Sequence, residues 1–124
     1  MEKYQVITLC GSTKFKDEFI RIQKELTLQG NIVISVGLFG HSGDNEVWDN
    51  TDIGSYSKTK LMLDEMHKQK IEMSDAIYVI NPNGYIGDST KNEIIFAFDR
   101  NKKVMSLEPI DMNKIFDISS HDWY

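Results

Sequence analysis

Cysteine is scarce in this sequence, and no long hydrophobic run is present. The 124 residues contain one cysteine, Cys10, so the chain can form no internal disulfide. Cys10 falls within an apolar stretch, where a cysteine is expected to pack as a small hydrophobic residue. The lack of a signal peptide and of an apolar stretch long enough to cross a bilayer predicts a cytoplasmic protein without membrane contacts.

The sequence also lacks a surplus of positive charge. Its formal net charge is −5, whereas binding to a nucleic acid polymer requires a basic surface that releases counterions. A small anion or a neutral ligand is compatible with this charge. The composition is that of an ordinary globular protein, with 40% hydrophobic and 27% charged residues and no low-complexity tract or repeat. We therefore expect residues 1–124 to form a single domain.

The first third of the chain predicts a strand, a helix and a second strand. Residues 4–10 are rich in β-branched and aromatic side chains and run directly into Gly11 and Ser12. A helix is predicted from Thr13 to Gly30, because four apolar residues recur at helical spacing: Phe15, Phe19, Ile22 and Leu26. Residues 31–36 form the next predicted strand. A helical connection between two buried strands implies parallel pairing.

Residues 37–55 follow, with no clear periodicity and many Gly, Asn and Asp residues. A loop of this length in a compact domain is usually functional, and Trp48 is among the residues that would line and close a pocket. The alternative is a disordered surface excursion. A second helix is predicted over residues 56–73, with Leu63, Met66 and Met73 along its apolar side.

Residues 75–99 read as a complete strand, loop and helix, and the rest of the chain is organised around them. An apolar run at 76–80 is followed by a turn-rich segment and a helix that opens at Ser89 and Thr90. A fourth strand is predicted at 103–107. These elements predict a small flavodoxin-like or Rossmann-like α/β domain of three layers, with about four parallel strands in the order 2-1-3-4.

Glu93 is the one carboxylate set into the apolar face of the helix that ends this unit. It lies beside the predicted core residues Ile94, Ala97 and Phe98, and no Lys or Arg lies three or four residues from it. An acid in such a position is expected to be desolvated and reactive. The alternative is a capping box, in which the Thr90 side chain accepts from the backbone N–H of Glu93 and the Glu93 side chain accepts from the backbone N–H of Thr90.

Two turns are predicted to meet at the carboxyl edge of the sheet. In the order 2-1-3-4, a crevice opens between strands 1 and 3. One turn contains Gly11 and Ser12, and the other runs from Asn81 to Ser89. Each precedes a helix N-terminus, where N–H groups can bind a phosphate, a hydroxyl or a carboxylate. The alternative is structural, with Gly11 permitting the turn and Ser12 capping the helix.

The combination of these segments resembles the nucleoside 2-deoxyribosyltransferase superfamily, which includes deoxynucleoside 5′-monophosphate N-glycosidases. The resemblance covers residues 4–108 and is carried by CGS after the first strand, SDAIYVIN and YIGDSTKNEIIFAFDRNKKV. It implies that Glu93 is the nucleophile that attacks C1′ of the sugar, and that Gly11 and Ser12 contact the nucleotide. Two acids of that family are replaced here by His67 and Gly87, and Asp88 or Asp64 would stand in for the second.

The expected reaction is cleavage of an N-glycosidic bond, by hydrolysis or by transfer. Glu93 would trap the sugar, while Asp88 or His67 would support the departing base. If His67 has such a role, activity would fall as pH drops through its titration, near 6.5 unless the pocket shifts it. Tyr85 and Trp48 would stack on the base. The remaining predicted substrate-binding residues are Cys10, Gly11, Ser12, Asn81, Gly87 and Ser89; no metal or cofactor is expected.

A non-catalytic nucleotide-binding or regulatory module on the same fold is the competing hypothesis. The replacement of a family carboxylate by His67 favours it, whereas the apolar setting of Glu93 favours an enzyme. We also expect a homo-oligomer, most simply a dimer, because Met62, Met66 and Met73 would leave apolar surface on the helices. The aromatic C-terminus, residues 121–124, is expected to take part in assembly or to pack on its own sheet.

Overall fold

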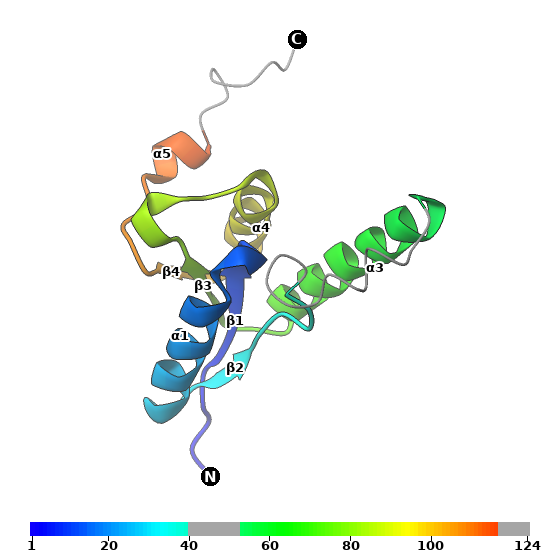
Figure 1. The fold of residues 1–124 in the computed structure, drawn as a ribbon. Coiled ribbons are helices and arrows are strands. Elements are labelled where there is room, and N and C mark those ends of the chain that lie inside the picture. The colour runs from blue at the N-terminus through cyan, green and yellow to red at the C-terminus, as the bar shows by residue number, and fades with distance from the viewer. Residues whose placement is uncertain (40–52, 117–124) are drawn as a thin grey trace.

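The computed structural model describes residues 1–39 and 53–116 of the chain (Figure 1). The elements in chain order are β1 (Val6–Gly11), the short 3-10 helix η1 (Thr13–Phe15), α1 (Lys16–Leu28), β2 (Ile32–Ile34), α3 (Ile53–Glu72), β3 (Ala76–Ile80), the 3-10 helix η2 (Pro82–Gly84), α4 (Asp88–Asp99), β4 (Lys103–Ser106) and α5 (Met112–Ile115). Within these two ranges, no helix is long and apolar enough to cross a membrane.

The four strands form one parallel sheet in the order β2-β1-β3-β4, as predicted. β1 lies at its centre, with Val6 opposite Ile32 of β2 and Ile7 opposite Ala76 of β3. β4 adds to the far side of β3. Because every strand runs in the same direction, the turns that follow β1 and β3 leave from the same edge of the sheet.

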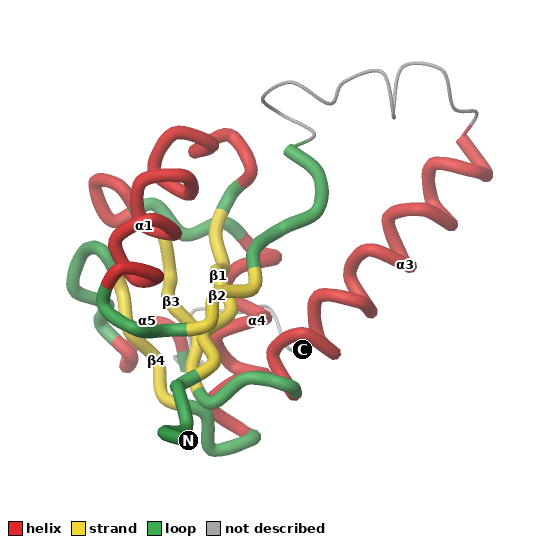
Figure 2. The backbone as a smooth tube through the Cα atoms, turned by 90° about the horizontal axis from the view of Figure 1, so that it is seen from below, coloured by secondary structure: helices red, strands yellow, loops and turns green. Residues whose placement is uncertain are grey.

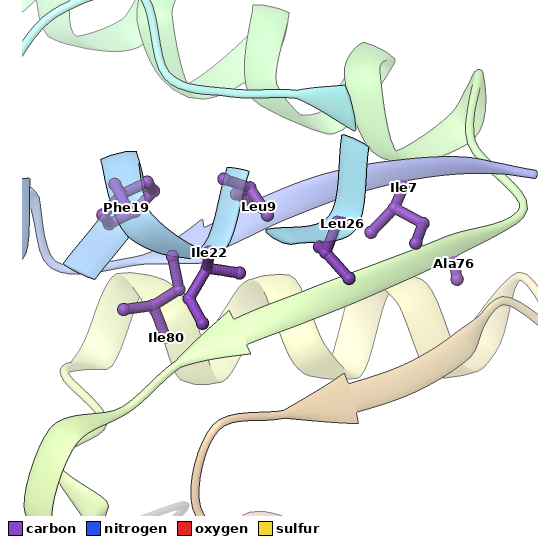
Figure 3. Packing of buried hydrophobic residues seen from close by; sticks show 7 residues of the cluster. All are labelled: Ile7, Leu9, Phe19, Ile22, Leu26, Ala76 and Ile80. Atoms are coloured by element: carbon purple, nitrogen blue, oxygen red, sulfur yellow. The ribbon is translucent and has the colours of Figure 1, made fainter. Parts of the chain in front are cut away.

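Helices cover both faces of the sheet, which gives the Rossmann-like arrangement of three layers (Figure 2). On one face, Phe19, Ile22 and Leu26 of α1 pack against alternate residues of β1 and β3, which are Ile7, Leu9, Ala76 and Ile80 (Figure 3). On the other face, Cys10, Ile77 and Val79 pack against residues of α3, α4 and α5, which are Ile71, Ile94, Ala97 and Ile115. The alternation of side chains along each strand therefore supplies two separate cores.

α3 contacts the sheet through its C-terminal half, whereas its N-terminal half extends away from the strands (Figures 1 and 2). The Thr8 hydroxyl donates to the carbonyl of Lys70 at 3.1 Å and also hydrogen-bonds the Ser74 hydroxyl. His67 and Ile71, which are next to Lys70 on the same side of the helix, are both buried. Leu63, Met66 and Met73 were predicted from the sequence to form the apolar side of this helix. This was wrong, because Met66 and Met73 are exposed and Leu63 is only half-buried.

Two further expectations need correction. The first helix does not start at Thr13, because a 3-10 turn occupies Thr13–Phe15 and α1 starts at Lys16. Phe98 is not a core residue but is 54% exposed, and the centroid of its ring lies 4.8 Å from that of Phe116. In addition, α5, which follows β4 and buries Ile115, was not anticipated from the sequence.

Gly11 ends β1 at a point where a side chain has no room. Its φ is +153°, and a Cβ atom placed on it would lie 2.7 Å from the carbonyl oxygen of Ile80. The two backbones approach this closely because Gly11 and Ile80 are paired in the register of β1 and β3. The glycine therefore lets the two central strands stay paired up to the edge where the following turns begin.

We expect Gly11→Ala to lower the free energy of unfolding by about 1–3 kcal/mol, because the new methyl group meets a backbone carbonyl that cannot move away alone. Urea denaturation of the variant and the wild type measures the change. Gly37→Ala is the matched control, since a Cβ atom at Gly37 has no heavy atom of the described residues within 4 Å. Equal stability of the Gly11 variant and the wild type would contradict the role given to this contact.

Candidate active site

A cavity of about 570 Å³ opens at the carboxyl edge of the sheet, between the turn after β1, the loop before α4 and one side of α3. Among the predicted site residues, it brings together Gly11, Ser12, His67, Tyr85, Gly87, Asp88, Ser89 and Glu93. The crevice expected between strands 1 and 3 is therefore present. Apolar atoms form most of its surface, but its lining also includes acidic and basic side chains: Lys60, Asp64, His67, Lys70, Asp88 and Glu93.

Glu93 lies in the second turn of α4 and faces this cavity with a side chain that is 20% exposed. The buried residues Thr90, Ile94 and Ala97 fix that helix against the sheet. Burial raises the pKa of Glu93 from 4.5 to about 8, and the negative charge of Asp64 adds to the rise. Lys60 and Lys68 act in the opposite direction but do not offset the loss of water.

His67 approaches Glu93 from α3. Its Nε2 atom lies 3.6 Å from Oε1 of Glu93 and 3.5 Å from Sγ of Cys10. Burial lowers the pKa of His67 to about 4, and the charge of Lys70 contributes in the same direction. The imidazole is therefore neutral at neutral pH. If activity depends on the protonation of His67, the midpoint of that dependence is therefore expected near pH 4 and not near pH 6.5.

Cys10 lies next to His67 and Glu93, on the side of the hydrophobic core. It is fully buried near the end of β1, and its Sγ atom is within hydrogen-bonding distance of Nε2 of His67 and within 4.8 Å of the Glu93 carboxyl group. Burial raises the pKa of Cys10 well above 9, and the nearby Glu93 carboxylate raises it further. Cys10 thus packs in the core as expected, and it reaches a substrate only through Glu93 and His67, because it is not among the residues that line the cavity.

The two turns have structural roles as well as positions on the cavity wall. Ser12 is the N-cap of η1, where its Oγ accepts from the N–H of Lys14 at 3.4 Å. Gly87 is the N-cap of α4, and none of the described side chains caps that helix. The capping box was therefore wrong: Thr90 is the third residue of α4 and is buried, and Glu93 lies one turn further on.

Two of the predicted contacts differ from the expectation. Asn81 is fully buried, donating to the carbonyl of Glu108 at 3.0 Å and accepting from its N–H at 2.9 Å, so its amide joins β3 to the segment after β4. Tyr85 lines the cavity, but Lys14 Nζ lies 3.6 Å from its ring centroid. A base that stacks on this ring face would have to displace Lys14. Trp48 lies outside the described residues.

Sequence reasoning identified part of the wall that α3 contributes. Besides His67, this helix places Lys60, Leu63, Asp64, Met66 and Lys70 on the cavity. Asp64 was considered as a site acid, and Leu63 and Met66 were assigned only to an apolar side, whereas Lys60 and Lys70 were missed. Positions 60, 63, 64, 67 and 70 are separated by three or four residues and so share one helical face, which was a usable signal.

The start of the long loop also lies at the cavity. Gly37 and Leu38 line it, as does Val36 just before them. Loop residues 40–52 lie outside the described residues.

The raised pKa of Glu93 predicts a specific dependence of stability on pH. Between about pH 4.5 and 8 the folded protein keeps a proton on Glu93 that the unfolded chain has lost. The free energy of unfolding should therefore fall as pH rises through this window, by about 1.4 kcal/mol for each unit of pKa difference. Glu93→Gln should lose this fall, while Glu65→Gln, an exposed site on α3, should retain it.

Urea denaturation at pH 5 and pH 8 in the presence of a chelator measures the difference between each variant and the wild type. Titration of His67 is common to all three proteins and cancels in the comparison. An identical pH dependence for the wild type and Glu93→Gln would show that Glu93 ionises in the folded protein as it does in the unfolded chain.

A comparison of the chain with models of known protein families gives no match, and a search among curated proteins gives none either. The resemblance to the nucleoside 2-deoxyribosyltransferase superfamily therefore stays a prediction from motifs. The functional argument below depends on the geometry of the cavity and on the chemistry of Glu93 and its neighbours.

Proposed function

We propose that the protein cleaves the N-glycosidic bond of a nucleoside or nucleotide, with Glu93 as the nucleophile at C1′. The observation that carries this proposal is the position of Glu93: a desolvated carboxyl group on the wall of a cavity at the carboxyl edge of a parallel sheet. Such edges are where open α/β sheets bind ligands. A carboxylate in a poorly solvated site is suited to trapping a sugar with oxocarbenium-like character.

The substrate would enter between two backbone turns. The Gly11-Ser12-Thr13 turn and the first residues of α4 both line the cavity. Helix N-termini carry N–H groups without intrahelical partners and a partial positive charge. These groups suit the hydroxyl or phosphate oxygens of a sugar, while the apolar part of the wall suits the base.

In the first step, an oxygen of the Glu93 carboxylate forms a bond to C1′ as the bond from C1′ to the base nitrogen breaks. The bonding electron pair leaves with the base, which takes up a proton from water. Asp88 and Asp64 both line the cavity and would support the departing base by accepting hydrogen bonds from it or from that water. His67 cannot be the proton donor at neutral pH, because with a pKa of about 4 its imidazole is neutral and not an imidazolium.

In the second step, water or the nitrogen of another base attacks C1′ and the bond to Glu93 breaks, which regenerates the carboxylate. Water as the acceptor makes the protein a hydrolase, and a second base makes it a transferase. His67 would act as a positioning residue in both steps, since its ring lies within 3.6 Å of the Glu93 carboxyl oxygen. Cys10 would hold the same carboxyl group from the core side.

One observation favours the alternative, a nucleotide-binding module without catalysis. With a pKa of about 8, Glu93 is mostly protonated at pH 7 and would then donate a hydrogen bond instead of attacking C1′. Binding without release of base would support this alternative. Incubation with nucleosides, deoxynucleosides, their 5′-monophosphates and NAD, followed by chromatography of the free base, separates the two functions.

On the best substrate of that panel, we expect Glu93→Gln to reduce base release by more than about a hundredfold, because the amide cannot form the sugar ester. For the wild type, kcat/KM should rise with pH up to about 8, as the carboxylate form becomes populated. Glu65→Gln serves as the control. Full turnover by Glu93→Gln would exclude Glu93 as the nucleophile, and a pH profile flat from 6 to 9 would contradict the required ionisation.

We further propose that the protein acts as a homodimer that uses the projecting part of α3. Leu61, Met62 and Met66 are 59%, 50% and 43% exposed on this helix, and Met66 also lines the cavity. Contiguous exposed apolar surface usually marks an interface, and closed twofold dimers are the commonest assembly. The expected contribution of residues 121–124 lies outside the described residues.

Light scattering should give twice the chain mass for the wild type and the single-chain mass for the double variant Leu61→Lys with Met62→Lys. Ile20→Lys is the matched control, since Ile20 is 54% exposed on α1 at the opposite face of the sheet. A monomeric wild type contradicts the dimer. A chain that ends at Ser120 tests the tail: unchanged mass and activity would exclude its participation.

A further inference from the structure

Three side chains from three different elements converge beside the cavity: Cys10 from β1, His67 from α3 and Glu93 from α4. Their donor atoms, Sγ, a ring nitrogen and a carboxylate oxygen, all lie within 4.8 Å of one another. The nucleotide chemistry proposed above gives a role to Glu93 but needs no sulfur beside it. The combination of thiol, imidazole and carboxyl is the donor set that zinc binds in proteins.

Two of the three distances between donor atoms in this cluster fit a tetrahedral metal ion. Zinc lies about 2.3 Å from sulfur and about 2.0–2.2 Å from nitrogen or oxygen, so tetrahedral angles place two donor atoms roughly 3.3–3.7 Å apart. Nε2 of His67 lies 3.5 Å from Sγ of Cys10 and 3.6 Å from Oε1 of Glu93. The third distance, from Sγ of Cys10 to the Glu93 carboxylate, is within 4.8 Å, so metal binding would draw these two side chains together.

The surroundings leave one coordination position open. His67 and Glu93 line the cavity, whereas Cys10 lies behind them in the core. A metal held by these three residues would have its fourth position directed to the cavity, as in zinc sites that bind water or an exogenous ligand. The thiolate and the carboxylate together supply two negative charges, which match a divalent cation in a poorly solvated site.

We propose that Cys10, His67 and Glu93 form a three-ligand site for one Zn²⁺ ion, with the fourth position open to the cavity. Binding displaces the protons of the Cys10 thiol and the Glu93 carboxyl group, which leave to the buffer, while His67 binds in its neutral form. Thiolate and imidazole select zinc over Mg²⁺ and Ca²⁺, which prefer oxygen ligands.

A consequence, which depends on the proposed function, is that Zn²⁺ inhibits base release. The carboxylate oxygen that would attack C1′ is then bound to the metal, so nucleophile and metal ligand are exclusive roles of Glu93. The pH dependences predicted above apply to the metal-free protein, for which the chelator is included. The binding site itself can be tested without any activity.

Co²⁺ is the spectroscopic probe for this site. Addition of Co²⁺ to the chelator-treated full-length protein should produce a sulfur-to-cobalt charge-transfer band and intense visible bands of a tetrahedral centre, saturating at one equivalent. Zn²⁺ should then remove these bands by displacement. Because Cys10 is the chain's single cysteine, wild-type protein that gives no charge-transfer band at saturating Co²⁺ overturns the proposal without any variant.

Three variants assign the ligands. Cys10→Ser should abolish the charge-transfer band, and His67→Gln and Glu93→Gln should each weaken Zn²⁺ binding by more than the 10–100-fold typical of outer-shell changes. Glu72→Gln, at a half-exposed site that pairs with Arg100, is the control and should bind as the wild type does. Circular dichroism confirms that each variant is folded. Undiminished Zn²⁺ affinity in folded His67→Gln or Glu93→Gln overturns the assignment.

The inhibition is tested separately on the best substrate of the panel. One equivalent of Zn²⁺ should suppress base release, and chelator should restore it. Cobalt bands without any base release would uphold the metal site while contradicting the proposed enzyme. Base release that is insensitive to stoichiometric Zn²⁺, in a protein that shows the bands, would contradict the shared role of Glu93.

Discussion

The burial of most of the Glu93 side chain, which leaves 20% of it exposed at the cavity wall, is the constraint on which the rest of the site depends. β1 supplies Cys10 below it, α3 supplies His67 beside it, and α4 holds Glu93 itself. No two of these elements are adjacent in the chain, so only the folded sheet brings them together. The C-terminal part of α3 is held against β1 by the hydrogen bond from the Thr8 hydroxyl to the Lys70 carbonyl, by the contact between the Thr8 and Ser74 hydroxyls and by the buried Ile71. The polar cluster and the core beneath it are thus parts of one packing arrangement.

The order of the sheet could be predicted from the sequence because its signals are local and repeated. Each strand is a short apolar run, α1 has a regular apolar stripe, and connections through helices impose parallel pairing. The buried side of α3 was predicted wrongly, and the reason is physical. Much of its apolar surface, including Met62 and Met66, is exposed, so hydrophobicity did not identify its inner side. The inner side combines the buried Ile71 with the polar His67 and with a hydrogen bond from Thr8 to the Lys70 carbonyl, and such a mixture has no periodic signature.

A site residue could be predicted from the sequence where its chemistry differed from that of its neighbours on the same element. Glu93 was an acid among apolar neighbours on its own helix, and the structure places it in a desolvated position. The partners of Glu93 were not predictable in the same way, since the contact of Cys10 with His67 joins positions 57 residues apart. Asn81 shows the opposite error. A polar residue at the carboxyl end of a strand suggested a ligand contact, but its amide satisfies the backbone of Glu108.

In the two proposals above, Glu93 is protonated in the empty site at neutral pH and loses that proton to bond either a sugar or a metal ion. The protonated form needs no partner and prevails in the empty site, because a carboxylate without a counter-charge is costly there. Both bonds require a centre of positive charge at the same point, either the oxocarbenium-like carbon of the proposed reaction or a divalent cation. Such a centre offsets the desolvation that keeps the proton in place. The same burial that suppresses Glu93 in the empty protein therefore makes the site selective for whatever brings positive charge to it.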